Sequence, residues 1–104
     1  MIFEKLAAVE RQYEEIAERL GSAQLQSDPT EYRKQSKLLA EIEETVERFR
    51  DYKVVDRGVA ESEEIVASGD PDMRELAEEE LKSLKGRREA LVAELKVLLI
   101  PKDP

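Results

Sequence analysis

Residues 66–72 read Val-Ala-Ser-Gly-Asp-Pro-Asp, and this short stretch decides how the chain folds. Gly69 closes one helical pattern, because glycine commonly follows the last residue of a helix. Asp70 can cap the next helix, and Pro71 suits its first position because the missing N–H needs no partner there. Two residues between two helices leave room only for a tight reversal. The stretch therefore predicts an antiparallel helical hairpin.

The helix after this turn carries apolar residues in heptad register. The predicted seam consists of Ala77, Leu81, Leu84, Leu91, Leu95 and Leu98. Arg88 takes the remaining seam position, and folding the chain back about Gly69 brings Asp51 or Glu47 opposite it. We therefore expect one of these carboxylates to hold Arg88. Pro101 cannot continue a helix, so the helix should span about residues 71–99.

A second cap of the same kind, Asp28-Pro29, opens the helix that precedes the turn. Glu31 stands where its side chain can reach back to the cap. Apolar residues then recur at spacings of three and four up to the turn, although the pattern shifts phase at residues 53–58. An interior glycine in that stretch costs about 1 kcal/mol relative to alanine. The pattern still predicts one long helix over about residues 29–68.

The N-terminal segment predicts a third helix over about residues 2–20. Its apolar stripe consists of Leu6, Val9, Tyr13, Ile16 and Leu20. We expect Gly21 to close this helix in a left-handed conformation and a polar loop to run from there to Ser27. The fold class is therefore all-α, an elongated antiparallel three-helix bundle or coiled-coil-like hairpin. The expected three-helix core consists of Phe3, Leu6, Ile42, Val46, Leu91 and Leu95.

The composition removes most kinds of catalytic site. The 104 residues include no His and no Cys. The chain therefore has no imidazole acid or base, no thiolate nucleophile and no ordinary zinc ligand set. Glutamates recur at helical spacing, but they lie outside the apolar stripes and therefore on solvent-facing sides of the helices. A di-metal site in a helical bundle also needs histidine. We expect no enzymatic activity, no cofactor and no metal in this chain.

The charge balance limits the partners. With 25 Asp and Glu against 17 Lys and Arg, the net charge is −8, so any contact with nucleic acid must be local. No stretch approaches the roughly 18 apolar residues that a membrane span needs. The first residues also lack the basic and apolar regions of a secretory signal. We expect a cytoplasmic protein without a membrane partner.

One basic cluster stands out from the acidic background, namely Lys82, Lys85, Arg87 and Arg88. These cations could contact phosphates, for instance of an RNA backbone, or a protein partner. They could equally balance the acidic side chains of the preceding helix, because the fold-back brings Asp51 and Asp56 to the same level. Both interpretations stay open at this point.

The C-terminal run Val97-Leu98-Leu99-Ile100 is apolar on all sides of the helix. A helix that faces one core needs only three or four apolar residues in seven. We therefore expect Leu99 and Ile100 to contact something outside the hairpin, either another domain or, weakly, a second copy of the chain. A disordered tail beyond Leu98 is the alternative.

Several longer motifs are specific enough to suggest a family. The chain begins with Phe3-Glu4-Lys5-Leu6 and continues with Ser27-Asp28-Pro29 and Glu31-Tyr32-Arg33. The most specific motifs are Asp70-Pro71-Asp72-Met73-Arg74-Glu75-Leu76-Ala77-Glu78-Glu79-Glu80-Leu81 and Val97-Leu98-Leu99-Ile100-Pro101-Lys102-Asp103-Pro104. With these motifs the chain resembles the N-terminal helical domain of the bacterial peptide chain release factor 1 family. Members of this class I family end translation at UAA and UAG codons.

The resemblance implies an auxiliary domain of a longer protein. In the family, a Pro-x-Thr tripeptide reads the stop codon and a Gly-Gly-Gln loop acts in the peptidyl transferase centre, and neither motif occurs in this sequence. Residues 1–100 would then form the helical domain, and residues 101–104 would begin a linker to a missing catalytic and codon-reading core. The implied partners are the ribosome near the large-subunit stalk base, accessory factors and the remaining domains of the factor.

Two other functions remain compatible with the sequence. A stand-alone coiled-coil adaptor or oligomerisation protein would show the same apolar periodicity. An RNA-binding module built on residues 82–88 is the other, and its affinity would fall steeply with added salt.

Overall fold

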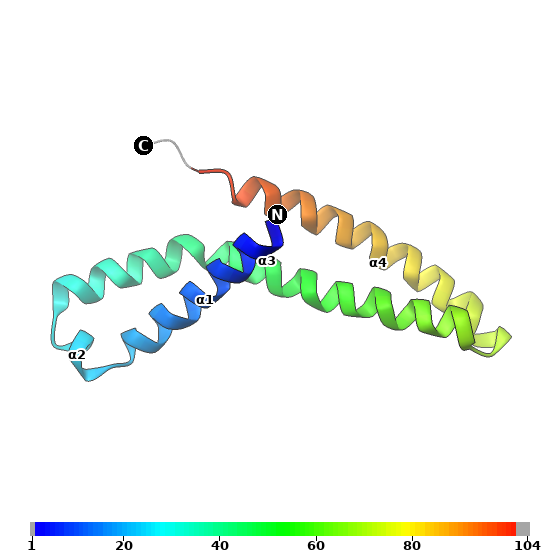
Figure 1. Cartoon of the computed structure of the whole chain (residues 1–104), viewed down its shortest axis with the longest axis horizontal. Coiled ribbons are helices and arrows are strands. Elements are labelled where there is room, and N and C mark those ends of the chain that lie inside the picture. Colours follow the sequence, from blue (N-terminus) through cyan, green and yellow to red (C-terminus); the bar gives the residue numbers. More distant parts are fainter. Residues whose placement is uncertain (1, 102–104) are drawn as a thin grey trace. The chain divides into compact units, whose positions relative to one another are not determined.

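The computed structural model describes residues 2–101 of the chain and contains only helices within that part. The helices are α1 (Ile2–Leu20), α2 (Ala23–Gln26), α3 (Pro29–Ser68) and α4 (Pro71–Leu98) (Figure 1). The chain forms two compact units, Met1–Glu47 and Arg48–Pro104, and α3 contributes to both. The prediction of an all-α fold with three long helices is confirmed. The predicted linker residues 102–104 lie outside the described part.

The first unit contains α1, α2 and the beginning of α3. Leu6 and Ile16 of the predicted stripe are buried on α1. Gly21, however, does not adopt the expected left-handed conformation, since no glycine has a positive φ. The chain instead leaves α1 through tight bonds from the N–H groups of Gly21 and Ser22 to the carbonyls of Glu18 and Arg19, at 3.1 and 2.9 Å.

The expected polar loop before α3 is itself partly helical. Ser22 caps α2, since its hydroxyl oxygen accepts a hydrogen bond from the N–H of Leu25 at 3.3 Å. A helix of four residues is too short to show an apolar period, which is why the sequence pattern did not reveal it.

The predicted start of α3 is confirmed at Asp28 and Pro29. The Asp28 carboxylate accepts a hydrogen bond from the Glu31 N–H at 3.1 Å, which satisfies one of the free donors of the first turn. The Glu31 side chain accepts a hydrogen bond from the Gln35 amide at 3.0 Å. This bond satisfies a polar side chain in a buried position, since Gln35 is only 9% exposed.

The structure confirms that α3 is one continuous helix through residues 53–58. Val55 on this stretch and Val59 directly after it are buried, so packing offsets the weak local propensity. Gly58 lies close to α4, because a Cβ placed on it would stand 3.1 Å from a Leu84 methyl carbon. The phase shift in the sequence therefore marks a close approach of two helices rather than a break.

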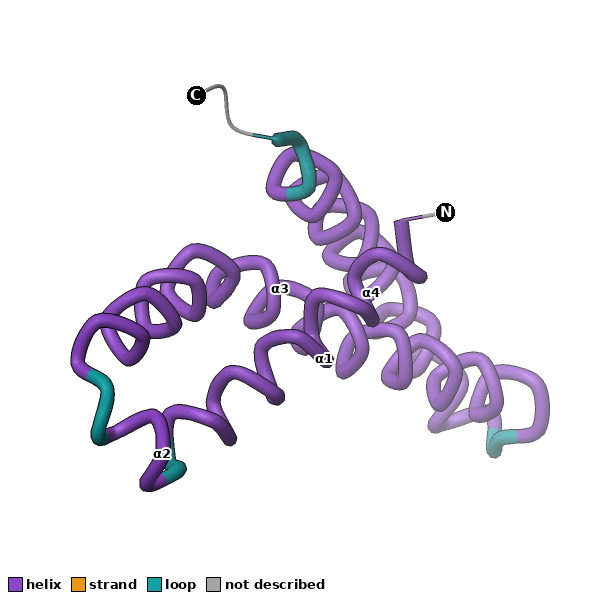
Figure 2. Tube along the Cα trace, turned by 60° about the vertical axis from the view of Figure 1, so that its left-hand side comes forward, coloured by secondary structure: helices purple, strands orange, loops and turns teal. Residues whose placement is uncertain are grey.

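The second unit is an antiparallel pair, in which the rest of α3 and α4 meet at Gly69 and Asp70 (Figures 1 and 2). The Asp70 carboxylate caps α4 by accepting a hydrogen bond from the Asp72 N–H at 3.2 Å. Gly69 donates its N–H to the Ile65 carbonyl at 2.7 Å, and a Cβ at this position would collide with the same carbonyl oxygen. The predicted cap is confirmed, and lack of space for a Cβ accounts for glycine here.

The seam of α4 is buried unevenly. Ala77, Leu91 and Leu95 are buried, while Leu81, Leu84 and Leu98 are half-buried. Of the other residues expected in the three-helix core, Leu6 and Val46 are buried and Ile42 is half-buried. Phe3 is 40% exposed, so its assignment to a core was wrong.

Candidate binding groove between α3 and α4

An open groove of 580 Å³ lies in the second unit, along the part of α4 that follows Leu84. One of its lining side chains comes from α3, Tyr52. The others come from α4 and are Lys85, Arg88, Glu89, Val92, Ala93 and Lys96. Positions 85, 89, 92 and 96 recur at spacings of four, three and four, so they form one stripe beside the buried seam.

Arg88 is held by a carboxylate of α3, as predicted, but the predicted partner was wrong. Its guanidinium lies 2.8 Å from an Asp56 carboxylate oxygen, and neither Asp51 nor Glu47 takes that role. Asp56 is five residues closer to the turn than Asp51. The helices are therefore paired in a different register from the one that the fold-back about Gly69 predicts.

The first turns of α4 are largely exposed. Met73 and Leu76 are 51% and 62% exposed, so buried packing on α4 begins only at Ala77. A fold-back about Gly69 would pair the two helices from the turn onward. In addition, side chains of a helix lean toward its N-terminus, which brings the Arg88 head closer to the turn than its own backbone.

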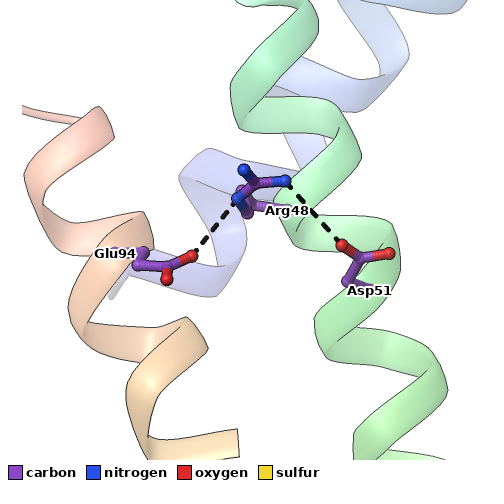
Figure 3. A network of polar contacts seen from close by, with 3 residues as sticks. All are labelled: Arg48, Asp51 and Glu94. Atoms are coloured by element: carbon purple, nitrogen blue, oxygen red, sulfur yellow. Dashed lines mark ion pairs between the residues drawn. The ribbon is translucent and has the colours of Figure 1, made fainter. Parts of the chain in front are cut away.

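Asp51 belongs to a different set of ion pairs, which Figure 3 shows. Arg48 lies 3.2 Å from the Glu94 carboxylate across the helix pair and 3.9 Å from Asp51 on its own helix. The side chains of Arg48 and Glu94 are 38% and 54% exposed. Each such pair contributes about 0–1 kcal/mol, so these contacts orient the helices more than they stabilise them.

Tyr52 forms the α3 wall of the groove. Its ring stacks on Phe49, with centroids 6.4 Å apart and planes 9° apart, and the Lys53 ammonium lies 4.8 Å from the centre of the Phe49 ring. Partial burial raises the pKa of the Tyr52 phenol, and the Asp56 carboxylate raises it further while Arg88 acts in the opposite direction. The wall is thus a fixed and neutral aromatic surface.

The structure divides the predicted basic cluster in two. Lys85 and Arg88 line the groove, whereas Lys82 and Arg87 do not. Lys82, Lys85 and Arg87 are exposed. Arg88 balances Asp56, which fits the second interpretation of the cluster for this residue. Lys96 also lines the groove and was not expected there, although its spacing from Lys85, Glu89 and Val92 carried the signal.

The two remaining predicted contact residues lie where α4 ends. Leu99 caps the helix, since its N–H donates to the Leu95 carbonyl at 3.1 Å, and its side chain is half-buried. Ile100 and Val97 are 64% and 66% exposed. The end of α4 thus presents two large apolar side chains to solvent.

The described part of the chain, residues 2–101, holds no group of three or more carboxylate, imidazole or thiolate side chains placed to bind a metal ion. None of its helices is long and apolar enough to cross a membrane.

Comparison with known proteins places the chain in a family. The PCRF domain model matches residues 9–104, which is nearly the whole chain. The chain belongs to the PCRF domain family. This membership agrees with the resemblance that the Asp-Pro-x-Met-Arg motif and the C-terminal motif indicated.

Three relatives of this PCRF domain bear the same name. The chain is 40% identical over 103 residues to peptide chain release factor 1 of Acidobacterium capsulatum. It is 43% identical over 104 residues to the protein of that name from Geobacillus kaustophilus, and 43% identical over 105 residues to that from Streptococcus equi. Each alignment covers 99% of this chain and 29% of the relative. No solved structure matches the chain.

Proposed function

We propose that this chain acts as the N-terminal domain of a peptide chain release factor 1, a protein that directs peptide release at UAA and UAG codons. The observation that carries the proposal is the identity of 40–43% over 99% of the chain to proteins of that name. The similarity extends from α1 to the end of α4, so it includes both units rather than one periodic helix. A stand-alone coiled-coil adaptor would not need such agreement.

The role proposed for the domain is auxiliary. The sequence contains neither Gly-Gly-Gln nor Pro-x-Thr, so stop-codon reading and hydrolysis would belong to other parts of the factor. The domain itself would contact the ribosome near the large-subunit stalk base, together with accessory factors, in the cytoplasm. It would have no enzymatic activity of its own.

The proposed domain arrangement places the helical domain at residues 1–100 and the beginning of a linker at residues 101–104. The exposure of Ile100 supports a contact of Leu99 and Ile100 with the remaining domains. In the isolated chain the same side chains would support weak self-association. A variant with Leu99→Ser and Ile100→Ser should then keep its helix content and lose any dimer seen by sedimentation.

A domain exchange tests the main proposal. The corresponding domain of the Geobacillus kaustophilus factor is replaced by this chain, and peptide release is measured on ribosomes that carry UAA, UAG or UGA. We expect the chimera to release peptide at UAA and UAG at rates comparable with the parent, and the isolated chain to release none. A folded chimera that releases no peptide at any of these codons contradicts the proposal.

We also propose that Lys82 and Arg87, the exposed members of the basic cluster outside the groove, contact ribosomal RNA or a protein of the stalk base. Their exposure and their position in a locally basic stretch support this proposal. The test compares binding of a stalk-base RNA fragment by the chain and by a Lys82→Glu, Arg87→Glu variant at several salt concentrations. Each phosphate contact contributes about −0.7 to −0.9 to the slope of log K against log salt, so the variant should show a shallower slope. An unchanged slope excludes these residues from RNA contact.

A further inference from the structure

We propose that the groove between Tyr52 and the second half of α4 is a docking site for an acidic amphipathic helix of a protein partner. The site is distinct from the exposed cations Lys82 and Arg87, and it does not rest on the proposed role in termination. The inference follows from three properties of the lining residues: which cations are free, what lies between them, and how far apart they are.

The free cations stand at the two ends of the α4 lining. Arg88 is already paired with Asp56 at 2.8 Å, so its charge is largely compensated. Lys85 and Lys96 take part in no ion pair with the described residues 2–101. Two uncompensated ammonium groups, one at either end of a groove, attract a ligand that carries carboxylates at both of its ends.

The part of the groove between Glu89 and Lys96 is apolar. Val92 and Ala93 lie between the two lysines on α4, and the Tyr52 ring faces them from α3. The stacking of Tyr52 on Phe49 holds this wall in place before any ligand arrives. A ligand that places small apolar side chains here gains from removing this surface from water, and the fixed wall lowers the entropic cost of binding.

The spacing of the lysines fits a helix. Lys85 and Lys96 are eleven residues apart, which corresponds to about 16 Å along α4. A partner helix that lies along α4 would need acidic residues about three turns apart with apolar residues on the same face between them. This is the usual pattern of a helix that binds in a groove, with anchors at spacings of three and four.

The same residues disfavour a nucleic acid in the groove. Glu89 lies between the two lysines. The backbone of a nucleic acid in the groove would place a phosphate next to this carboxylate, and the two negative charges would repel each other. The lining contains a single aromatic ring, that of Tyr52, whereas single strands stack successive bases on several rings. An amphipathic helix avoids both problems, because its central residues on this face are apolar.

The experiment uses a defined probe and a matched control. The probe is an end-blocked helical peptide of Ala, Leu and Glu, with Glu about three turns apart and Leu between them on one face. Its binding to the chain is followed by fluorescence anisotropy. The test variant is Lys85→Glu with Lys96→Glu. The control is Lys82→Glu with Arg87→Glu, which changes the charge by the same amount on the same helix outside the groove.

We expect the peptide to bind the chain and the control variant with similar affinity. Its affinity for the test variant should be lower by about tenfold or more. Glu89→Gln should strengthen peptide binding, because it removes the one carboxylate from the lining. Circular dichroism of each variant verifies that the helices are retained. No peptide binding to the chain, or equal losses in both double variants, overturns the proposal.

A second probe separates the two kinds of anionic partner. Single-stranded polyuridylate is titrated against the same variants. If polyuridylate binds more tightly than the peptide and loses its affinity in the Lys85→Glu, Lys96→Glu variant alone, the groove is a nucleic-acid site and the assignment to an acidic helix is wrong. Weaker binding of polyuridylate that falls at least as much in the Lys82→Glu, Arg87→Glu variant supports the assignment.

Discussion

The two ends of the α3–α4 hairpin are built from the same two helices but are stabilised in different ways. Near the turn, Ile65, Met73 and Leu76 are 37%, 51% and 62% exposed. In the second half of α4, Leu91 and Leu95 are 1% and 0% exposed. Apolar residues thus occur along the whole hairpin, but within residues 61–80 the only buried one is the small Ala77, whereas the larger Val59, Leu91 and Leu95, at 0–1% exposure, lie further from the turn. The hydrophobic contribution to stability is therefore concentrated at the groove end.

Charge differs between these two ends as well. Residues 61–80 carry nine Asp and Glu and one Arg, a net charge of −8. Because the chain has 25 acidic and 17 basic residues in total, the other 84 residues carry 16 of each. The turn end therefore holds like charges close together, while the groove end has the ion pairs of Arg48 and Arg88. Opening of the hairpin should begin at the turn, where fewer buried contacts oppose it.

The largest expected effect comes from truncating the same residue type at the two ends. Leu91→Ala should lower the free energy of unfolding by about 2–5 kcal/mol, because it leaves a cavity at a position that is 1% exposed. Leu76→Ala on the same helix should change it by no more than about 0.5 kcal/mol. Urea unfolding followed by circular dichroism measures both. Equal losses would show that the turn end is packed as tightly as the groove end.

The turn itself should tolerate no side chain at Gly69. Gly69→Ala places a Cβ against the Ile65 carbonyl oxygen, which belongs to the backbone and cannot move aside cheaply. We expect a loss of more than about 1 kcal/mol in the free energy of unfolding, because the native conformation does not accept the new residue. The same urea titration measures this loss. Unchanged stability would mean that the turn relaxes freely and that its close contact has no energetic consequence.

Substituting the two glycines inside helices should lower the free energy of unfolding at neither position. Gly86→Ala should raise the free energy of unfolding by about 1 kcal/mol, since a Cβ there meets nothing within 4 Å and alanine is the better helix residue. Gly58→Ala gains the same propensity but pushes a Leu84 methyl group that would lie 3.1 Å away. The two terms should nearly cancel. A gain at Gly58 as large as that at Gly86 would show that Leu84 moves without cost.

Local signals in the sequence predicted most of the fold. The caps at Asp28 and Asp70 depend on residues one to three positions apart, so the sequence alone contains what is needed to find them. Helix length followed in the same way from the apolar period. The end of α1 at Leu20 was predicted, but Gly21 suggested a left-handed cap that the structure does not have, and the short helix α2, which Ser22 caps, was missed.

The candidate groove could be predicted only in part, because it depends on how two helices meet. Arg88 was expected to pair with α3, but its pairing with Asp56 depends on the register of the two helices, and no local pattern shows this. Lys96 lies in a stripe beside the seam, and it becomes a groove residue only when Tyr52 stands opposite it. Register and opposing side chains are properties of the pair, so a periodicity within one helix cannot supply them.

The smallest expected effect concerns the pH dependence of the groove end. The pKa of Tyr52 is raised by burial first and by Asp56 second. The folded chain therefore keeps the phenolic proton at pH values where the unfolded chain, with a tyrosine pKa of about 10, has lost it. This contribution to stability is fully present below about pH 10 and is lost as the pH rises through the higher folded value.

Tyr52→Phe removes the titrating group and isolates this contribution. We expect the free energy of unfolding of the variant to fall less steeply above about pH 10 than that of the unchanged chain. Asp56→Asn in the unchanged background should lower the folded pKa of Tyr52, because it removes a negative charge and leaves Arg88 to act alone. Ultraviolet absorbance of the phenolate follows the titration directly. If neither substitution changes the alkaline part of the stability curve, Tyr52 is as accessible to water in the folded chain as in the unfolded chain, and the groove wall is not fixed.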